Sequence, residues 1–494
     1  MKMLRRLCLG VFAVIGAGGA AAQTAQGLPV TRLAVQARAG VSDLLCSPAP
    51  VKPSAPKVVD PDPQEPPDAQ DVESLLGTLL PERETPPAGA VRGAWAQARP
   101  GQPLRVAIWG DSHLAAGFFT SELVRLLPWT GEQVATQFIG AHMNRPGVRL
   151  PLLRKGCISA HWKHEPAYAD AGAAAAPGPA LVSLSSSREG AALAWDVRSV
   201  SGQADKSQMR LLYQQTSEPV QLGIVVDDGA EQVLTLQGAP GPAVLELVGD
   251  APLSVVRLRL LSGAFRWQGL QWPVPEPTRL QLDVFGYPGA TVTAWQRAHA
   301  EALAPWWRDV SYDLVMLEFG TNEGNVQPFD AQAYAQTLRA SVTAWRAQFP
   351  QASCVLIGPG DRGVLVRRSQ KAKPAGRNAK GKHAQIHKST KAPKSAKGKA
   401  APVAKPSTDL LRFTRVHQEI ARLQNQVAAE QGCRFWGMLD AMDGAGGAYR
   451  WASQTPPLMA RDLIHFTVPG YQRLAQRFAQ DMGWQAERLW PDAR

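Results

Sequence analysis

A serine hydroxyl stands where a predicted buried strand gives way to a predicted helix. Residues 104–109 form an apolar run typical of a short buried strand, and residues 114–127 carry leucines at helical spacing. Gly110 and Asp111 fill the turn between them, so Ser112 would begin the helix. There its Oγ is exposed for nucleophilic attack, and its backbone N–H can donate to an oxyanion. Considered alone, Gly-Asp-Ser is more simply explained by a helix cap.

A serine nucleophile needs a general base, and His465 has the most suitable context. Asp462 precedes His465 by three residues, so its carboxylate could orient the imidazole and stabilise the protonated form. Taken alone, such a pair is more simply explained as a surface pair without a catalytic role. His113 follows Ser112 directly and is poorly placed to reach back to it. The other histidines lie in predicted helices, in a basic segment, or in or beside a predicted insertion: His142, His161, His164, His299, His383, His387 and His417.

Strands that alternate with helices must position these side chains. This alternation predicts a parallel sheet covered by helices on both faces, with the active residues on loops beyond the carboxyl ends of the strands. We assign residues 103–149 and 280–485 to this domain. Besides 104–109, the predicted strands are 280–285, 313–319, 354–357 and 433–439; the predicted helices are 291–304, 330–349, one around 413–427 and one from Pro469 to about Gly483.

Residues 150–279 have a different pattern, because their apolar residues alternate at period two. Asp228-Gly229 supplies a hairpin turn between two such runs. Short strands at this spacing predict a β-sandwich inserted between the first two strands of the parallel sheet. Three tryptophans could stack on sugar rings, although core packing is the simpler assumption for each: Trp195, Trp267 and Trp272.

Residues 1–22 are typical of a secretory signal peptide. Basic residues precede an apolar run too short to span a bilayer, and Ala20-Ala21-Ala22 offers a cleavage site. We therefore expect cleavage after Ala22, export to the periplasm and no transmembrane segment. Residues 23–102 should form a proline-rich tether with one short helix near 71–80, since residues 48–67 contain eight prolines.

Four cysteines remain after the signal peptide, in an oxidising compartment. Cys354 and Cys433 each lie near the start of a predicted strand, so they could pair if those strands are neighbours. Buried free thiols are an equal alternative for them, and the sequence leaves the pairing of Cys46 and Cys157 open. The run His161-x-x-His164-Glu165 has passable metal-ligand spacing but no third convincing ligand. We therefore predict no metal and no cofactor.

Residues 367–405 contain thirteen Lys or Arg and no Asp or Glu, which predicts a disordered lysine-rich loop within the catalytic domain. Without these and the three basic residues of the signal peptide, the formal charge of +12 becomes −4. The basicity is therefore local and gives no reason to expect nucleic-acid binding. An anionic envelope polymer or lipid head groups are the suggested partners of this loop, and a solvated insertion without a partner is the alternative.

Four segments together resemble, in order, the four sequence blocks of the SGNH (GDSL-type) hydrolases. They are Gly110-Asp111-Ser112, a glycine-bearing loop after the second strand, Gly320-Thr321-Asn322-Glu323 and Asp462-Leu463-Ile464-His465. The resemblance implies a flavodoxin-like three-layer α/β/α domain with a five-stranded parallel sheet. It also implies Ser112 as nucleophile, His465 as general base and Asp462 as its orienter, with an oxyanion hole from the Ser112 and Gly289 N–H groups and the Asn322 amide. Gly286 is the rival for the glycine role. Glu323 stands in place of the usual aspartate, and Asp111 is expected to be structural.

A narrower resemblance is to the periplasmic peptidoglycan O-acetylesterases, which carry a carbohydrate-binding-module-like insertion. It rests on His113 after the serine, the Gly-Thr-Asn-Glu variant, the signal peptide and the insertion. It implies removal of O-acetyl groups from an envelope glycan, with peptidoglycan favoured, through an acetyl-serine intermediate. Two alternatives remain open at this point: an O-acetyltransferase that uses the same triad, and a catalytically inactive glycan-binding protein.

Overall fold

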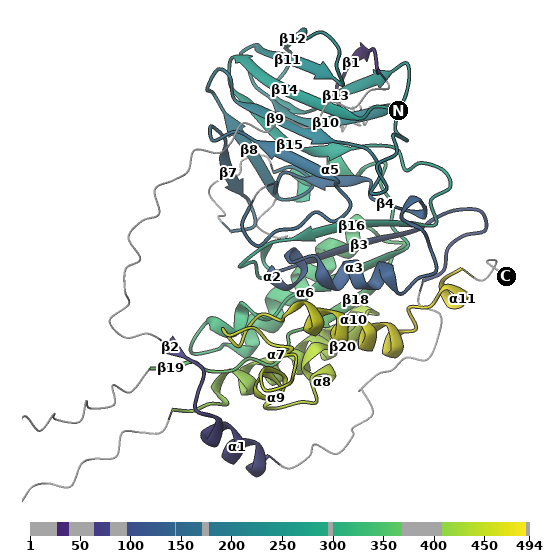
Figure 1. The fold of residues 1–494 in the computed structure, drawn as a ribbon. Helices are drawn as coiled ribbons and strands as arrows, with labels where there is room; N and C mark the ends of the chain where they lie inside the picture. The colour runs from purple at the N-terminus through teal and green to yellow at the C-terminus, as the bar shows by residue number, and fades with distance from the viewer. Residues whose placement is uncertain are drawn as a thin grey trace, which may run out of the picture.

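The computed structural model describes residues 27–38, 64–79, 96–143, 145–169, 177–294, 300–367 and 408–490, which form a mixed α/β structure. The predicted signal peptide (1–22), Cys46 and nearly all of the lysine-rich loop (367–405) lie outside these residues. Figure 1 shows two largely antiparallel sheets above a parallel sheet that is flanked by helices. The lower part carries the residues with the predicted chemistry.

The lower part is built on six parallel strands in the order β20-β18-β17-β3-β16-β4. Five correspond to predicted strands, and the two-residue strand β4 is an addition to the expected five. Along β3, Val106 and Ile108 face one apolar layer while Ala107 and Trp109 face the other. Burial on both faces explains the continuous apolar run. The strands are β3 (Leu104–Gly110), β4 (Val134–Ala135), β16 (Leu280–Gly286), β17 (Leu314–Glu318), β18 (Ser353–Gly358) and β20 (Arg434–Gly437).

Helices cover both faces of the parallel sheet and give it three layers. One apolar layer combines β3 with α3 (Phe118–Arg125) and α10 (Val468–Met482). The other combines it with α6 (Ala331–Gln348) and α7 (Arg412–Gln431). The remaining helices of this part are short: α2 (Ser112–Ala115), α5 (Ala300–Trp307), α8 (Met438–Ala441), α9 (Gly447–Ala452), α11 (Ala486–Leu489) and the 3-10 turns η1 (Gly131–Gln133) and η2 (Glu323–Asn325).

Two predicted helices differ from those in the structure. The helix expected over 114–127 is divided into α2 and α3 because Gly117 between them has a φ of +72°, outside the helical region. Of the helix expected over 291–304, residues 292–293 form a turn, Ala294 is helical and α5 begins at Ala300, while 295–299 lie outside the described residues.

The upper part, here called the two-sheet region, comprises residues 138–271 and β1. One sheet has the order β1-β13-β10-β15-β8-β7 with β5 beside β15, and the other has the order β12-β11-β14-β9-β6. Trp195 of β9 and Trp267 of β15 are fully buried with ring centroids 5.2 Å apart, so the sheets pack face to face. The strands are β5 (Phe138–Gly140), β6 (Lys155–Ile158), β7 (Lys163–Pro166), β8 (Val182–Ser186), β9 (Ala192–Asp196), β10 (Gln208–Gln215), β11 (Val220–Val226), β12 (Gln232–Leu236), β13 (Gly241–Gly249), β14 (Val255–Ser262) and β15 (Phe265–Gln271).

The segment expected to be a tether contributes to both parts. Strand β1 (Val30–Val35) pairs in parallel with β13, and its last residue is buried. The expectation that residues 23–102 form only a tether with one short helix is therefore wrong for this segment, which gains its partner from a sheet far along the chain. The short helix expected near 71–80 is present as α1 (Ala69–Thr78). Strand β2 (Gln64–Glu65) pairs with β19 (Val366–Arg367).

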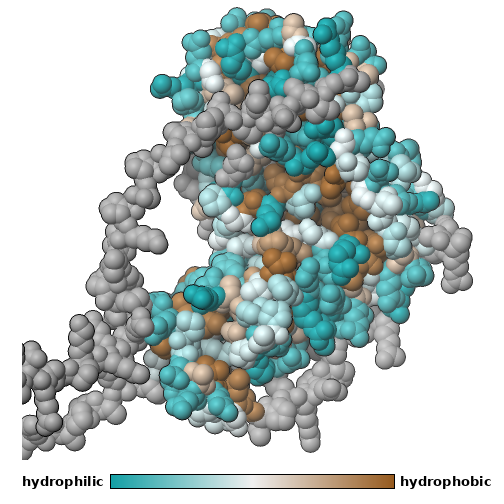
Figure 2. All heavy atoms as spheres, viewed as in Figure 1, coloured by the Kyte–Doolittle hydropathy of each residue, from teal (hydrophilic) through white to brown (hydrophobic). Residues whose placement is uncertain are grey.

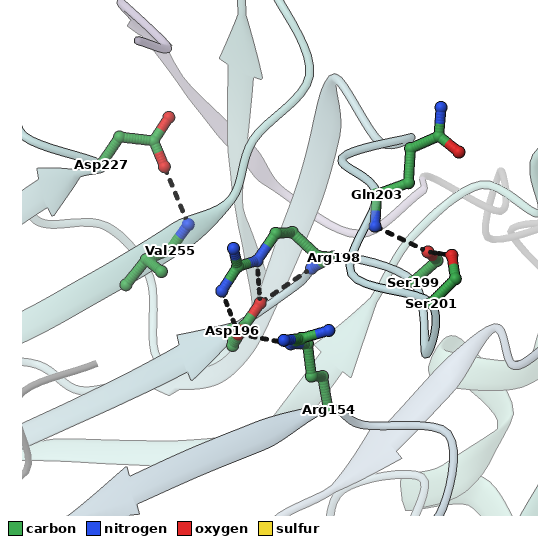
Figure 3. Close-up of polar contacts among 8 residues, drawn as sticks. All are labelled: Arg154, Asp196, Arg198, Ser199, Ser201, Gln203, Asp227 and Val255. Carbon is green, nitrogen blue, oxygen red and sulfur yellow. Dashed lines mark hydrogen bonds and ion pairs between the residues drawn. The ribbon is translucent and has the colours of Figure 1, made fainter. Parts of the chain in front are cut away.

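Polar contacts fix the loops of the two-sheet region (Figure 3). The buried carboxylate of Asp196 accepts a hydrogen bond from Arg154 Nε at 3.1 Å and two from the Arg198 guanidinium at 2.8 and 2.6 Å. Asp227 accepts from the Val255 N–H at 2.8 Å. Because each buried carboxylate has several donors, the turns at the ends of β9 and β11 are held in place.

Hydrophobic residues gather where the two parts meet on the face shown in Figure 2. A groove of about 190 Å³ at this junction is lined by residues of α3, β4, β5 and β16 together with 149–152. The apolar layer around Trp109 also continues without a break into the core of the two-sheet region. The upper part is therefore packed against the lower part over an apolar surface.

Cys354 of β18 and Cys433, just before β20, form a disulfide. The strands are neighbours in the sheet, which was the condition stated for pairing. Cys157 is disulfide-bonded as well. Among the described residues, no helix has the length and apolar character needed to cross a membrane.

Candidate active site

Ser112 is the first residue of α2 and directly follows the turn after β3. The turn is fixed by Asp111, whose side chain accepts the His113 N–H at 2.8 Å and thereby caps the helix. The Asp111 N–H in turn donates to Glu318 at the end of the neighbouring strand β17, at 3.0 Å to Oε2. Asp111 is thus structural, as expected, and the strand-to-helix turn presents the Ser112 hydroxyl at the carboxyl edge of the sheet.

The structure brings the distant residues Ser112, His465 and Asp462 into one hydrogen-bonded chain. Ser112 Oγ lies 3.0 Å from His465 Nε2, and His465 Nδ1 lies 2.7 Å from Asp462 Oδ2. The imidazole and carboxylate side chains are 40% and 43% exposed, so the chain is open to solvent on one side. This is the geometry in which an imidazole can accept the serine proton while a carboxylate holds it in the required tautomer.

The electrostatics of the pair suit a general base. The hydrogen bond to Asp462 is the main reason why the pKa of His465 is raised. Partial burial opposes ionisation of Asp462, yet hydrogen bonds from the His465 side chain and backbone lower the pKa of that carboxyl below its ordinary value. Asp462 is therefore charged at neutral pH, where it stabilises the imidazolium that forms during proton transfer.

The loop that carries this pair is held by its own backbone. Asp462 Oδ1 accepts the N–H groups of Ile464 and His465, each at 2.9 Å. The Ala460 N–H donates to the His465 carbonyl at 2.8 Å. Leu463 has a φ of +55°, which lets the chain turn tightly between the two functional residues. One carboxylate oxygen is thus used for the loop and the other for the imidazole.

The predicted oxyanion donors lie on loops that contact one another beside Ser112. The Tyr287 N–H donates to the Gly110 carbonyl at 2.9 Å, which ties the loop after β16, here called the second loop, to the serine turn. Gly289 has a φ of +82° with open space beside its Cα, and no backbone acceptor in the described part of the chain takes its N–H. Gly286 instead packs against α2, where a Cβ would come within 2.4 Å of the Ala115 backbone. The geometry therefore favours Gly289 over Gly286 as the free donor.

Asn322 lies in the loop after β17, here called the third loop, and its side chain reaches the serine turn. Its side-chain amide donates to the Ala290 carbonyl at 2.8 Å and to Asp111 Oδ2 at 3.3 Å. The amide is therefore next to the serine turn, but in this structure both of its N–H groups have protein acceptors. To donate to an oxyanion, it must exchange one of these acceptors for the substrate.

Three buried carboxyl groups, those of Asp111, Glu318 and Glu323, lie beneath the site. No positioning role was predicted for Glu318 or Glu323. Burial raises the pKa of Asp111 to about 6 and that of Glu323 to about 7, and it raises the pKa of Glu318 well above its usual range. Glu323 Oε1 accepts the Val292 N–H at 2.8 Å, which links the third loop to the second. Glu323, which stands where the resemblance led us to expect an aspartate, therefore has a positioning role. The sequence signal that could have identified Glu318 as a functional residue is its position as an acidic residue at the end of the apolar strand β17.

His113 packs under the triad. Its ring centroid is 5.4 Å from that of His465, and its Nδ1 lies 3.2 Å from the Tyr471 hydroxyl. Burial lowers the pKa of His113 to about 3, so the ring is neutral at physiological pH. His113 was not predicted to be the general base, and its ring contact with His465 was not predicted either.

His417 and His164 make their contacts away from the Ser112–His465–Asp462 chain, and His299, His383 and His387 lie outside the described residues. His417 lies in α7 with Nδ1 2.7 Å from the Gly360 carbonyl. His164 lies on β7 near Arg145, and Glu165 accepts hydrogen bonds or ion pairs from Ser185 and Arg266. Within the described ranges, no group of three His, Cys, Asp or Glu side chains is arranged to hold a metal ion.

Comparison with known proteins agrees with this architecture. Residues 261–473 match the sequence profile of the GDSL-like lipase/acylhydrolase family, a range that includes Asn322, Asp462 and His465 and begins after Ser112. A solved structure of a peptidoglycan O-acetylesterase superposes with a TM-score of 0.52 at 20% identity, covering 78% of this chain and 91% of that chain. A family two carbohydrate esterase from Clostridium thermocellum, solved with cellohexaose, has a TM-score of 0.25 at 10% identity, covering 61% and 95%. No curated protein matches the chain. The chain is therefore similar to the GDSL-like lipase/acylhydrolase family over residues 261–473, and its fold is similar to that of a peptidoglycan O-acetylesterase.

Proposed function

We propose that this protein is a secreted serine esterase that removes O-acetyl groups from a cell-envelope glycan, with peptidoglycan the favoured substrate. The observation that carries the proposal is the continuous hydrogen-bonded chain from Ser112 Oγ through His465 to Asp462. An esterase domain of the GDSL-like family and the fold shared with a peptidoglycan O-acetylesterase support the class of substrate. Export through residues 1–22 would place the enzyme where such glycans occur.

In the proposed reaction, Ser112 Oγ attacks the acetyl carbonyl carbon while His465 Nε2 takes the hydroxyl proton. The tetrahedral oxyanion would be stabilised by the N–H groups of Ser112 and Gly289 and by the Asn322 amide. His465 then returns the proton to the departing sugar oxygen, which leaves an acetyl-serine. A water molecule, deprotonated by the same imidazole, attacks this ester and releases acetate, and the proton goes back to Ser112. No step needs a metal or a cofactor.

The decisive test measures acetate release from O-acetylated peptidoglycan by the wild type and by Ser112→Ala. The proposal predicts acetate from the wild type and a loss of at least about a thousandfold in Ser112→Ala. A chromogenic acetyl ester run in parallel separates esterase activity from glycan specificity. If neither substrate is hydrolysed by a correctly folded wild type, the esterase proposal is wrong. If only the chromogenic ester is hydrolysed, the glycan assignment is wrong.

A further inference from the structure

Arg362 lies between two loops of the candidate active site. On one side, the N–H of the next residue, Gly363, donates to the Leu463 carbonyl at 2.9 Å, inside the loop that carries Asp462 and His465. On the other side, the Arg362 guanidinium donates to the side chain of Asn325, three residues after Asn322. The positive charge of Arg362 is close enough to act electrostatically on both Asp462 and His465.

The backbone around Arg362 is fixed. The neighbouring Asp361 is almost fully buried and accepts the Thr414 hydroxyl at 2.6 Å and the Ala448 N–H at 3.0 Å. Gly363 packs so closely that a Cβ there would come within 2.8 Å of the Leu463 side chain. The guanidinium is therefore presented from a loop with little freedom, as a recognition group requires.

A second arginine lies on the same aromatic ring. The Arg362 Cζ is 3.9 Å from the centroid of Phe413, and the Arg412 Cζ is 4.6 Å from it. Neither guanidinium has an ion pair within the described part of the chain. The nearby acids are already used, because Asp462 binds His465 and Asp409 pairs with Arg415. Two cations held together on one ring without an ion-paired carboxylate repel each other, and Asp462, which attracts Arg362, is already bound to His465.

We propose that Arg362, Phe413 and Arg412 form a subsite for a carboxylate on the acetylated glycan, so that the enzyme prefers acetyl esters of acidic sugars. Guanidinium groups match a carboxylate in geometry and charge, and a half-buried arginine gains most from such a partner. The subsite rests on the esterase function proposed above and adds to it the charge of the substrate. The carboxylate would bind between the loop of Asn325 and the loop of His465.

The test uses two substrates that differ by one carboxylate: 6-O-acetyl-N-acetylmuramic acid, with a free lactyl group, and 6-O-acetyl-N-acetylglucosamine. The wild type should hydrolyse the acidic ester with a kcat/KM about tenfold to a hundredfold higher. Arg362→Met should remove that preference, mainly by raising KM for the acidic ester. Arg412→Met should reduce it in part. Arg362→Lys keeps the charge and should retain part of the preference.

Arg415→Met is the matched control, because it removes one positive charge from the same helix at a residue already paired with Asp409. It should leave the preference intact. Equal rates on both sugar esters by the wild type would overturn the subsite while leaving the esterase function in place. An equal loss on both esters in Arg362→Met would also overturn it, since that result assigns the arginine to holding the two loops. Absence of acetate from every acetyl ester would instead defeat the esterase proposal on which the subsite rests.

Discussion

The replacement Asp462→Asn tests the proposed base most directly. The asparagine carbonyl oxygen can still accept the two backbone N–H groups that Asp462 Oδ1 accepts at 2.9 Å, so the loop should keep its shape. The amide NH2 would then face His465 Nδ1, now 2.7 Å from a carboxylate oxygen. A donor at that place stabilises the tautomer with the proton on Nε2. The imidazole would then donate to Ser112 instead of accepting its proton.

Loss of the required tautomer should lower kcat by about 10³ to 10⁴, equivalent to about 4 to 5.5 kcal/mol of transition-state stabilisation. The pH profile should move as well. His465 acts only when neutral, so activity falls as the pH drops below its pKa, which Asp462 holds above the ordinary value. Removing the carboxylate should therefore shift the acidic limb of the profile to lower pH.

The assay is the initial rate on a chromogenic acetyl ester between pH 4 and 9, with circular dichroism to confirm the fold. Asp228→Asn, the same change at an exposed hairpin residue, is the control and should match the wild type. A variant that keeps kcat within tenfold of the wild type, with an unshifted acidic limb, would refute the role of Asp462.

Three further predictions concern stability and the second loop. Burial raises the pKa of Glu323 to about 7, so its contribution to the free energy of unfolding is complete below pH 4.5 and is lost as the pH rises through 7. In Glu323→Gln, the decline in the free energy of unfolding between pH 5 and pH 8 should be smaller than in the wild type, by about 3 kcal/mol at most. Urea unfolding at the two pH values measures this difference. Replacing Cys354 and Cys433 together by alanine opens a loop of 79 residues and should cost up to about 4.5 kcal/mol, seen as a lower Tm measured without reducing agent, which would also cleave the disulfide of Cys157. The Tyr168 hydroxyl donates to the Pro288 carbonyl at 3.3 Å, in the second loop. Tyr168→Phe should therefore reduce kcat a few fold with KM unchanged. An unaffected kcat would show that the second loop does not need this contact.

Much of the catalytic part could be predicted from the sequence because its signals are local. Strands buried on both faces, such as Leu314–Glu318, are continuous apolar runs whose type does not depend on tertiary context. The helix α10 begins after Thr467 and ends at Gly483, and both residues are typical of those positions. The spacing of Asp462 and His465 likewise lies within one turn of chain, and the structure places them in contact.

The features that escaped prediction depend on contacts between distant segments. Val30–Val35 becomes a strand only because β13, more than 200 residues later, offers an open edge. The link from Asp111 to Glu318 and the link from Arg362 to Asn325 each join two loops that are separate in sequence. No local pattern marks such a pair, since each residue alone is an ordinary polar side chain in a loop or at a strand end.

The placement of β1 has a practical consequence for anyone who shortens this protein. A chain that starts at Pro103 would appear to discard only linker, yet it would also remove the outermost strand of the upper sheet. The hydrogen-bonding groups along that edge of β13 would then be left uncovered. Bare edges of this kind recruit strands from other molecules, so such a truncation should aggregate, and expression should start upstream of Val30.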